Sequence, residues 1–163
     1  MSDKADRGVP IKLIATNPNA KRNYLIQEFL EAGIALQGTE VKSLRSQSPN
    51  LRDSYVDIRS RKDRLEAWLL NTHVPPYSHG NIWNHEPTRE RKLLLHASET
   101  KKLFGAITQK GMTIIPTRMY FKKGIAKVEL GLGKGKKKKD QREQVKARTA
   151  KREMDRAMKS GKR

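Results

Sequence analysis

Apolar and polar residues alternate along residues 125–132, a pattern that predicts a half-buried β-strand. Successive side chains of a strand point to opposite faces, so Lys127 and Glu129 should share the outer face. Lys127 is therefore expected to face solvent. The positions of the predicted inner face are Ala126, Val128, Leu130 and Leu132.

Two antiparallel hairpins are expected from the apolar segments and the turns between them. The β-rich residues 112–121 precede the strand just described, and the Lys-Lys-Gly sequence at 122–124 predicts the turn that joins them. A second hairpin pairs residues 55–59 with residues 65–70 across the charged loop 60–64.

Three helices are indicated by capping signals. Asn17 followed by Pro18 is an N-cap and first-turn signal, which predicts a helix that continues through Phe29 and stops near Gly33. Residues 39–45 predict a short second helix. Residues 98–110 predict a third, with the glycine that follows as its C-terminal stop.

These elements together predict a mainly β fold with short helices. Short strands that close around a small core, with flanking helices packed outside, are typical of an OB-like antiparallel β-barrel. The chain has 163 residues, about the length of one ordinary domain. We expect a flexible N-terminus at residues 1–10, an OB-like domain at residues 11–133 and a separate tail at residues 134–163.

The positive charge of the chain indicates a class of binding partner. The chain has 36 Lys and Arg against 17 Asp and Glu, a formal net charge of +19 and a pI near 10.4. Such a charge is the electrostatic signature of a nucleic-acid-binding protein. It also occurs in proteins that are merely soluble or that coat anionic membranes, and charge alone separates these classes poorly.

The tail holds more than half of this charge. Residues 134–163 contain 14 Lys and Arg against 4 Asp and Glu, and no Leu, Ile, Phe, Tyr or Trp. Such a segment buries too little apolar surface to offset its ordering entropy, so we expect it to be disordered when free. Its composition favours helix after Asp140, so it could become helical against a partner.

Cysteine is absent, which excludes disulfides and cysteine-ligated zinc. This absence fits a reducing cytosol. The sequence has no run of about 18 apolar residues and no apolar segment of a signal peptide near residue 1, so we expect a cytoplasmic protein that does not enter membranes.

The residues that could carry catalysis do not form a recognisable site. The histidines His73, His79, His85 and His96 show no HExxH spacing and no clustered carboxylates, so they are expected to be surface or structural residues. No nucleophile with a paired base is evident. We therefore expect neither an enzyme nor a bound metal or cofactor.

Three longer segments carry a family resemblance. The first reads EAGIALQGTEVKSLR from Glu31 and continues as NLRDSY from Asn50. The second reads NHEPTRERKLLLH from Asn84, and the third reads AKVELGLGKGKK from Ala126. In order and spacing these segments resemble small protein B, the SsrA-binding or transfer-messenger-RNA-binding family of bacteria, over about residues 11 to 160.

The resemblance implies an adaptor of trans-translation and ribosome rescue. In that family a β-barrel binds the tRNA-like domain of transfer-messenger RNA and delivers it to stalled ribosomes, and the tail becomes helical on the ribosome. The tail occupies the empty decoding centre and mRNA channel beside small-subunit rRNA. The protein is expected to act as a monomer.

Particular positions match the family's contact residues. The RNA-binding face implied by the resemblance comprises Asn17, Glu31, Leu94, Lys127, Lys134, Lys136 and Lys137. Each has a structural alternative, since Asn17 could only cap a helix, Leu94 could only be core and Glu31 could only form an ion pair. The implied contacts with the decoding centre and mRNA channel are Lys138, Lys139, Asp140, Gln141, Arg142, Ala157 and Met158.

The tail departs from the family at three of these positions. Lys139 stands where some relatives have a histidine or aromatic-like residue, so a phosphate contact is expected there rather than ring stacking. Gln141 replaces a common lysine, and Ala157 is small for an anchoring residue.

Two other functions compete with the adaptor. A structural ribosomal protein would share the basic body and tail, but it would be present on every salt-washed ribosomal subunit. A nuclease that cleaves stalled mRNA would need a metal or an acid–base pair, and no such constellation is located.

Overall fold

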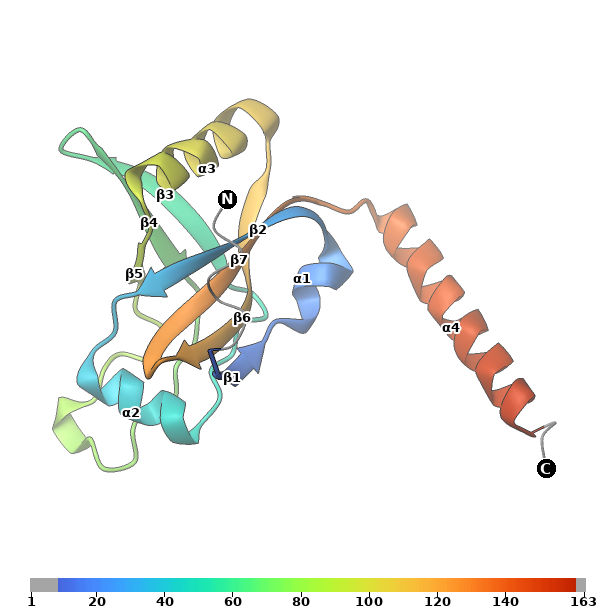
Figure 1. Ribbon diagram of the computed structural model, residues 1–163, viewed down its shortest axis with the longest axis horizontal. Coiled ribbons are helices and arrows are strands. Elements are labelled where there is room, and N and C mark those ends of the chain that lie inside the picture. The colour runs from blue at the N-terminus through green and yellow to red at the C-terminus, as the bar shows by residue number, and fades with distance from the viewer. Residues whose placement is uncertain (1–8, 161–163) are drawn as a thin grey trace.

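The computed structural model describes residues 9–160, and Figure 1 shows a β-structure from which one long helix projects. Residues 1–8 of the predicted flexible N-terminus and residues 161–163 of the tail lie outside the described residues. In chain order the elements are β1 (Ile11–Thr16), α1 (Pro18–Asn23), β2 (Tyr24–Ile34), α2 (Gly38–Ser46), β3 (Tyr55–Arg61), β4 (Arg64–Leu70), the 3-10 helix η1 (Asn81–Trp83), β5 (Arg91–Leu94), α3 (Ala97–Lys110), β6 (Thr113–Lys122), β7 (Ile125–Gly135) and α4 (Lys138–Ser160).

The antiparallel strand pairings close on themselves. β7 pairs with β2 along one edge and with β6 along the other, and the remaining pairings run from β6 through β3, β4 and β5 to β2. β1 pairs with the second half of β6, beyond the point where Ile114 meets β3. The apolar core lies inside this closed sheet, and its fully buried side chains include Leu69, Leu103, Ile114, Met119, Val128 and Leu130.

Both predicted hairpins are confirmed, with tighter turns than expected. β6 and β7 are joined by Lys123 and Gly124, whose φ angles of 51° and 75° are those of a two-residue hairpin turn. β3 and β4 are joined by Lys62 and Asp63 alone, because Arg61 and Arg64 still pair. The predicted loop 60–64 was therefore too long, and most of it extends the two strands.

The first predicted helix was wrong beyond its first turns. α1 begins at Pro18 after the expected cap, but it ends at Asn23, and the chain continues as the eleven-residue strand β2. The exposure of its side chains alternates along β2, but apolar residues such as Leu25, Ile26 and Phe29 occupy both faces, so their spacing imitates that of a helix. Pairing with β7 over residues 24–33 overrides that local pattern.

The other helices agree with the sequence more closely. α2 and α3 confirm the predicted second and third helices, and Gly111 ends α3 in the left-handed region at φ 59°. β1 and β5 were not predicted. β7 continues to Gly135, so two residues assigned to the tail belong to the sheet. The rest of the tail is the helix α4, and its disorder in the free protein stays a prediction.

A buried ion pair joins α2 to β5. Glu40 and Arg91 both have fully buried side chains, and Arg91 Nε donates to Glu40 Oε1 at 2.7 Å. Arg89 donates to the same carboxylate at 2.6 and 2.8 Å, and the backbone N–H of Gln37 donates at 2.8 Å. Burial alone would raise the pKa of Glu40, but these donors and the charge of Arg91 hold it below its usual value.

Replacing Glu40 by Gln is expected to lower the free energy of unfolding by about 3 to 5 kcal/mol, because Arg91 then stays buried without its counter-ion. Urea unfolding followed by circular dichroism measures the loss. Glu153→Gln, which removes an exposed carboxylate on α4, is the control and should change stability by less than about 0.5 kcal/mol. Equal stability of the two variants would refute the role of the pair.

The same variants test the acid dependence of this pair. The pKa of Glu40 is lower in the folded state, so the unfolded chain binds the extra proton as the pH falls. The stabilisation is complete above the usual value of 4.5 and is lost as the pH falls through the lower folded value. The advantage of wild type over Glu40→Gln should therefore shrink on acidification, and an advantage that grows would contradict the assignment.

Candidate nucleic-acid interface

The outer face of β2, β7 and β6 brings together residues from distant parts of the chain. Lys127 of β7 lies opposite Gly33 of β2 and opposite Tyr120 of β6, and directly opposed residues share one face of a sheet. Glu129, two residues along the same strand, lies opposite Glu31 and Arg118. We call this surface the outer face, and its polar members are Glu31, Thr117, Arg118, Tyr120, Lys122, Lys127 and Glu129.

Glu31 is fixed by two neighbours on this face. The hydroxyl of Tyr120 donates to Glu31 Oε2 at 2.5 Å, and Lys122 Nζ lies 3.2 Å from the same oxygen. Burial raises the pKa of Tyr120, and the Glu31 carboxylate raises it further, so the phenol keeps its proton. The Glu31 side chain remains about one-third exposed, so it can accept further hydrogen bonds.

A second acidic group is also held in place. Glu129 accepts from Thr117 Oγ1 at 2.7 Å and from Arg118 at 2.8 and 2.9 Å. The guanidinium of Arg118 lies 5.2 Å from the centre of the Tyr120 ring, which links the two acidic groups. The side chains of this network therefore hold one another in defined positions.

Lys127 differs from its neighbours because its ammonium has no hydrogen-bond or ion-pair partner among residues 9–160. It is half-buried, one row along the sheet from the opposed pair Glu31 and Glu129. Leu94 lies beside it over Gly33, where an added Cβ would come within 3.1 Å of the Leu94 Cβ. Leu94 is 56% exposed, so it is not a core residue. The arrangement offers one unpaired cation next to an exposed apolar surface.

The basic residues after β7 have different surroundings. Lys134 and Lys137 are exposed, whereas Lys136 is half-buried. Lys136 Nζ donates to the carbonyl of Lys21 at 2.7 Å and to Gln144 Oε1 at 2.9 Å, and its backbone N–H donates to Asn23 O. Lys136 therefore connects the end of α1 to the first turns of α4.

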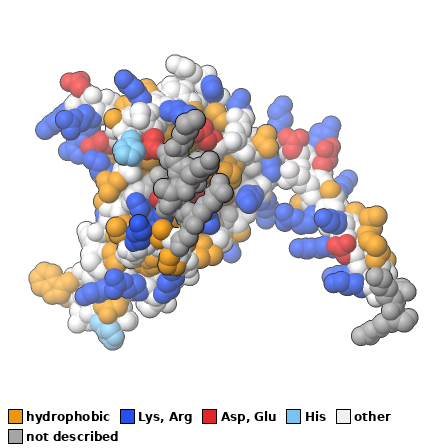
Figure 2. Space-filling view, in the orientation of Figure 1, with side chains coloured by type: hydrophobic (Ala, Val, Ile, Leu, Met, Phe, Trp, Pro, Cys, Tyr) orange, Lys and Arg blue, Asp and Glu red, His pale blue; other side chains and the backbone are white. Residues whose placement is uncertain are grey.

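The tail residues lie on a helix that projects from the sheet into solvent (Figure 1). Lys138, Lys139, Asp140 and Arg142 are exposed and Gln141 is half-buried. Lys and Arg side chains are distributed along α4 (Figure 2). Exposed apolar side chains interrupt them towards the C-terminal part, where Met158 follows Ala157 and is 65% exposed.

Asn17 is placed differently from the other predicted contacts. It is buried, its Nδ2 donates to Pro116 O at 2.9 Å, and its Oδ1 accepts from the backbone N–H of Asn19 at 3.0 Å. Its own N–H donates to Thr117 O at 2.8 Å. The geometry supports the capping alternative, and direct RNA contact by Asn17 stays a prediction.

The histidines fill structural or separate positions. His85 is buried, with Nε2 3.1 Å from the carbonyl of Val74 and Nδ1 2.9 Å from Thr39 Oγ1. Nε2 must donate to that carbonyl, because a carbonyl oxygen can only accept. Among the described residues no group of three or more His, Asp or Glu side chains is placed to hold a metal.

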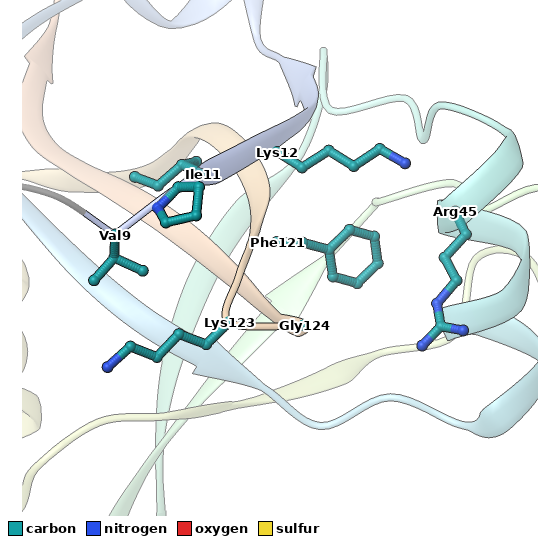
Figure 3. Close-up of a pocket in the computed structure, with 8 residues that line it drawn as sticks. Val9, Ile11, Lys12, Arg45, Phe121, Lys123 and Gly124 are labelled. Atoms are coloured by element: carbon teal, nitrogen blue, oxygen red, sulfur yellow. The ribbon is translucent and has the colours of Figure 1, made fainter.

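A shallow cavity lies between β1, the β6–β7 turn and α2. Lys12 and Arg45 extend towards the space beside Phe121, whereas Lys123 points away from it (Figure 3). Val9, Pro10 and Ile11 supply the apolar part of the lining. The lining contains no carboxylate or histidine, so the cavity suits an anion better than a cation.

The sequence analysis missed Arg118, Tyr120 and Lys122. Their alternation along β6 carries the signal, because it places all three on one face of the predicted strand. The association of Tyr120 and Lys122 with Glu31 depends on pairing between segments about 90 residues apart, which local patterns do not reveal.

Comparisons with known proteins show the family of this chain. The family model for the SmpB protein matches residues 14–160. The chain belongs to the SmpB family. The SsrA-binding protein of Trichodesmium erythraeum (strain IMS101) is 51% identical over 160 residues, which cover 98% of this chain and 99% of that protein. The SsrA-binding protein of Geobacillus sp. (strain WCH70) is 51% identical over 146 residues, 90% of this chain and 92% of that protein.

A solved structure is similar as well. In the work described as "tmRNA-SmpB: a journey to the center of the bacterial ribosome", one chain is 45% identical to this protein and aligns with a TM-score of 0.61. The alignment covers 76% of this chain and 85% of that one. The SmpB match over residues 14–160 spans every predicted contact residue, from Asn17 to Met158. Within the described residues, no helix has the length and apolar character needed to cross a membrane.

Replacing Asn17 by Ala should lower the free energy of unfolding by about 1 to 2 kcal/mol, because the helix loses its cap. Asn17→Ser keeps an oxygen for the cap but loses the bond to Pro116, so its loss should be smaller. Thermal melts measure stability, and gel-shift titrations corrected for the folded fraction measure RNA binding. If a fully stable Asn17→Ala protein binds RNA more weakly, Asn17 makes a direct RNA contact and is more than a helix cap.

Proposed function

We propose that this protein is an adaptor of trans-translation rather than an enzyme, which binds the tRNA-like domain of transfer-messenger RNA and delivers it to stalled ribosomes in the bacterial cytoplasm. The observation that carries the proposal is the outer face, where Lys127 is unpaired beside a fixed acidic group and exposed Leu94. Family membership and the names of the relatives support it. The closed sheet is interpreted as an OB-like barrel that acts as a monomer.

The outer face has donors, acceptors and apolar surface for recognising folded RNA. Lys127 can neutralise a phosphate without breaking an ion pair of its own. Glu31 can accept from the amino group of an unpaired base, and Leu94 can contact a base or ribose. Exposed Lys134 and Lys137 extend the positive surface towards the tail. The resemblance also includes Asn17 and Lys136, whose contacts suggest that they shape the surface.

The tail is proposed to distinguish an empty mRNA channel from an occupied one. α4 is exposed along its length and carries many cations, so the phosphates of rRNA are a suitable environment for it. An occupied channel would exclude it sterically. Lys138, Lys139, Asp140, Gln141 and Arg142 would lie at the decoding centre, and Ala157 and Met158 further along the channel.

Glu31→Ala and Lys127→Ala should each weaken binding to transfer-messenger RNA by about 1 to 3 kcal/mol, the usual range for a well-placed polar contact. Gel-shift titrations at fixed salt measure the affinity, and thermal melts measure stability. Lys110→Ala, at the end of α3, removes one charge away from the outer face and should have a much smaller effect. Normal affinity with a lowered melting temperature would assign Glu31 and Lys127 to structure instead.

Ending the chain after Lys137 should separate RNA binding from rescue. The shortened protein keeps the closed sheet and the backbone bond of Lys136 to Asn23, so transfer-messenger-RNA binding should fall only modestly. Tagging of nascent peptides on stalled ribosomes should fall to background, because nothing then enters the channel. Both activities are measured beside the full-length protein. Tagging at the full-length rate would refute the role of the tail.

A further inference from the structure

The turn before β5 displays two large apolar side chains that pack against little else. Ile82 is 87% exposed and Trp83 is 80% exposed, the highest values among the exposed large apolar side chains of the described residues. Both belong to η1. Figure 2 shows an apolar lobe beside Lys and Arg side chains at the lower left, where the yellow-green segment that contains η1 lies in Figure 1. An exposed tryptophan forgoes the free energy of burial, which makes it a candidate contact residue.

The backbone of this turn is nevertheless fixed. The amide of Asn84 accepts from the N–H of Tyr77 and donates to its carbonyl, both at 2.9 Å. Gly80 N–H also donates to Tyr77 O, and Trp83 N–H donates to Gly80 O. A Cβ on Gly80 would lie 2.5 Å from Asn84 Oδ1, so the hydrogen bonds between the Asn84 amide and Tyr77 require glycine at position 80. Trp83 is therefore exposed on an ordered turn.

The base of the loop is tied to α2. His85 bridges Thr39 and the carbonyl of Val74, as described above. Ser43 Oγ donates to Pro75 O at 2.5 Å, and Gln47 Nε2 donates to Pro76 O at 3.3 Å. These bonds oppose a collapse of the loop that would bury the indole ring. The ring is thus preorganised for an external partner, which lowers the entropic cost of binding.

The size and charge of this surface favour an RNA base as the partner. A stable protein interface buries about 800 Å² on each side, far more than one indole and one isoleucine offer. An indole face is large enough for one nucleobase, and stacking on it tolerates any base. Lys42 lies in the same loop–α2 region, with its Nζ 5.7 Å from the Tyr77 ring, and can attract the phosphate of such a nucleotide.

We propose that Trp83 stacks on an unpaired nucleobase of an RNA that the protein contacts during delivery. This inference rests on the proposed function but concerns a different surface. In Figure 1, η1 lies beside α2 at the opposite side from the start of α4, so Trp83 and the tail would reach different RNA segments. The base belongs either to transfer-messenger RNA or to ribosomal RNA.

Trp83→Phe and Trp83→Leu distinguish stacking from simple apolar contact. Phe keeps an aromatic face, whereas Leu keeps apolar surface without one. The affinity of each full-length variant is measured for a transfer-messenger RNA transcript alone and, by pelleting, for stalled ribosomes with that RNA present. We expect Trp83→Leu to lose about 5- to 100-fold in one of the two arms and Trp83→Phe to lose less than about 5-fold there. The arm that responds identifies the source of the base.

Tryptophan fluorescence reports directly on the surroundings of the Trp83 indole ring. In a Trp68→Phe background Trp83 is the only tryptophan, and the transcript should quench its emission if transfer-messenger RNA supplies the base. Equal affinities of the Phe and Leu variants in both arms would overturn the proposal. A wild-type protein that binds no transfer-messenger RNA would instead refute the proposed function, while the pelleting arm would still decide the role of Trp83.

Discussion

The double pairing of β7 is the constraint on which the rest of the structure depends. This strand pairs with β2 and β6 at once, and both neighbours approach it closely at its glycines. A Cβ on Gly133 would lie 2.3 Å from the carbonyl oxygen of Leu25, and one on Gly131 would lie 2.9 Å from Thr117 Cγ2. The pairing closes the sheet, buries one face of β7 and places Lys127 beside Glu31 on the other.

The basic charge is divided between surfaces of different rigidity. On the outer face the cations Arg118 and Lys122 are engaged by carboxylates, so the position of each charge is defined. On α4 the cations lie on an exposed helix whose apolar side chains, such as Met154, have no core to enter. The first surface suits recognition of one folded RNA, and the second suits attraction to any dense array of phosphates.

Whether an element could be predicted from the sequence depends on how far apart in the chain its interacting residues lie. The β6–β7 hairpin and α3 depend on contacts close in the chain, and both were predicted. β2 was mistaken for helix, because its apolar residues lie on both faces at spacings that imitate a helix and its partner lies about 100 residues away. The family resemblance selected Glu31, Leu94 and Lys127 for the face, but the Tyr120 hydrogen bond that fixes Glu31 required the fold.

An acidic residue on the proposed RNA-binding face has a physical rationale here. Glu31 engages Lys122, and Glu129 engages Arg118, so two of the cations on this face are already paired. Lys127 in the neighbouring row keeps its charge unpaired, which makes a phosphate at that one point more favourable than at its neighbours. A uniformly basic face would bind phosphates in many registers. The carboxylates therefore reduce the number of positions in which an RNA can bind tightly, and specificity arises from that reduction.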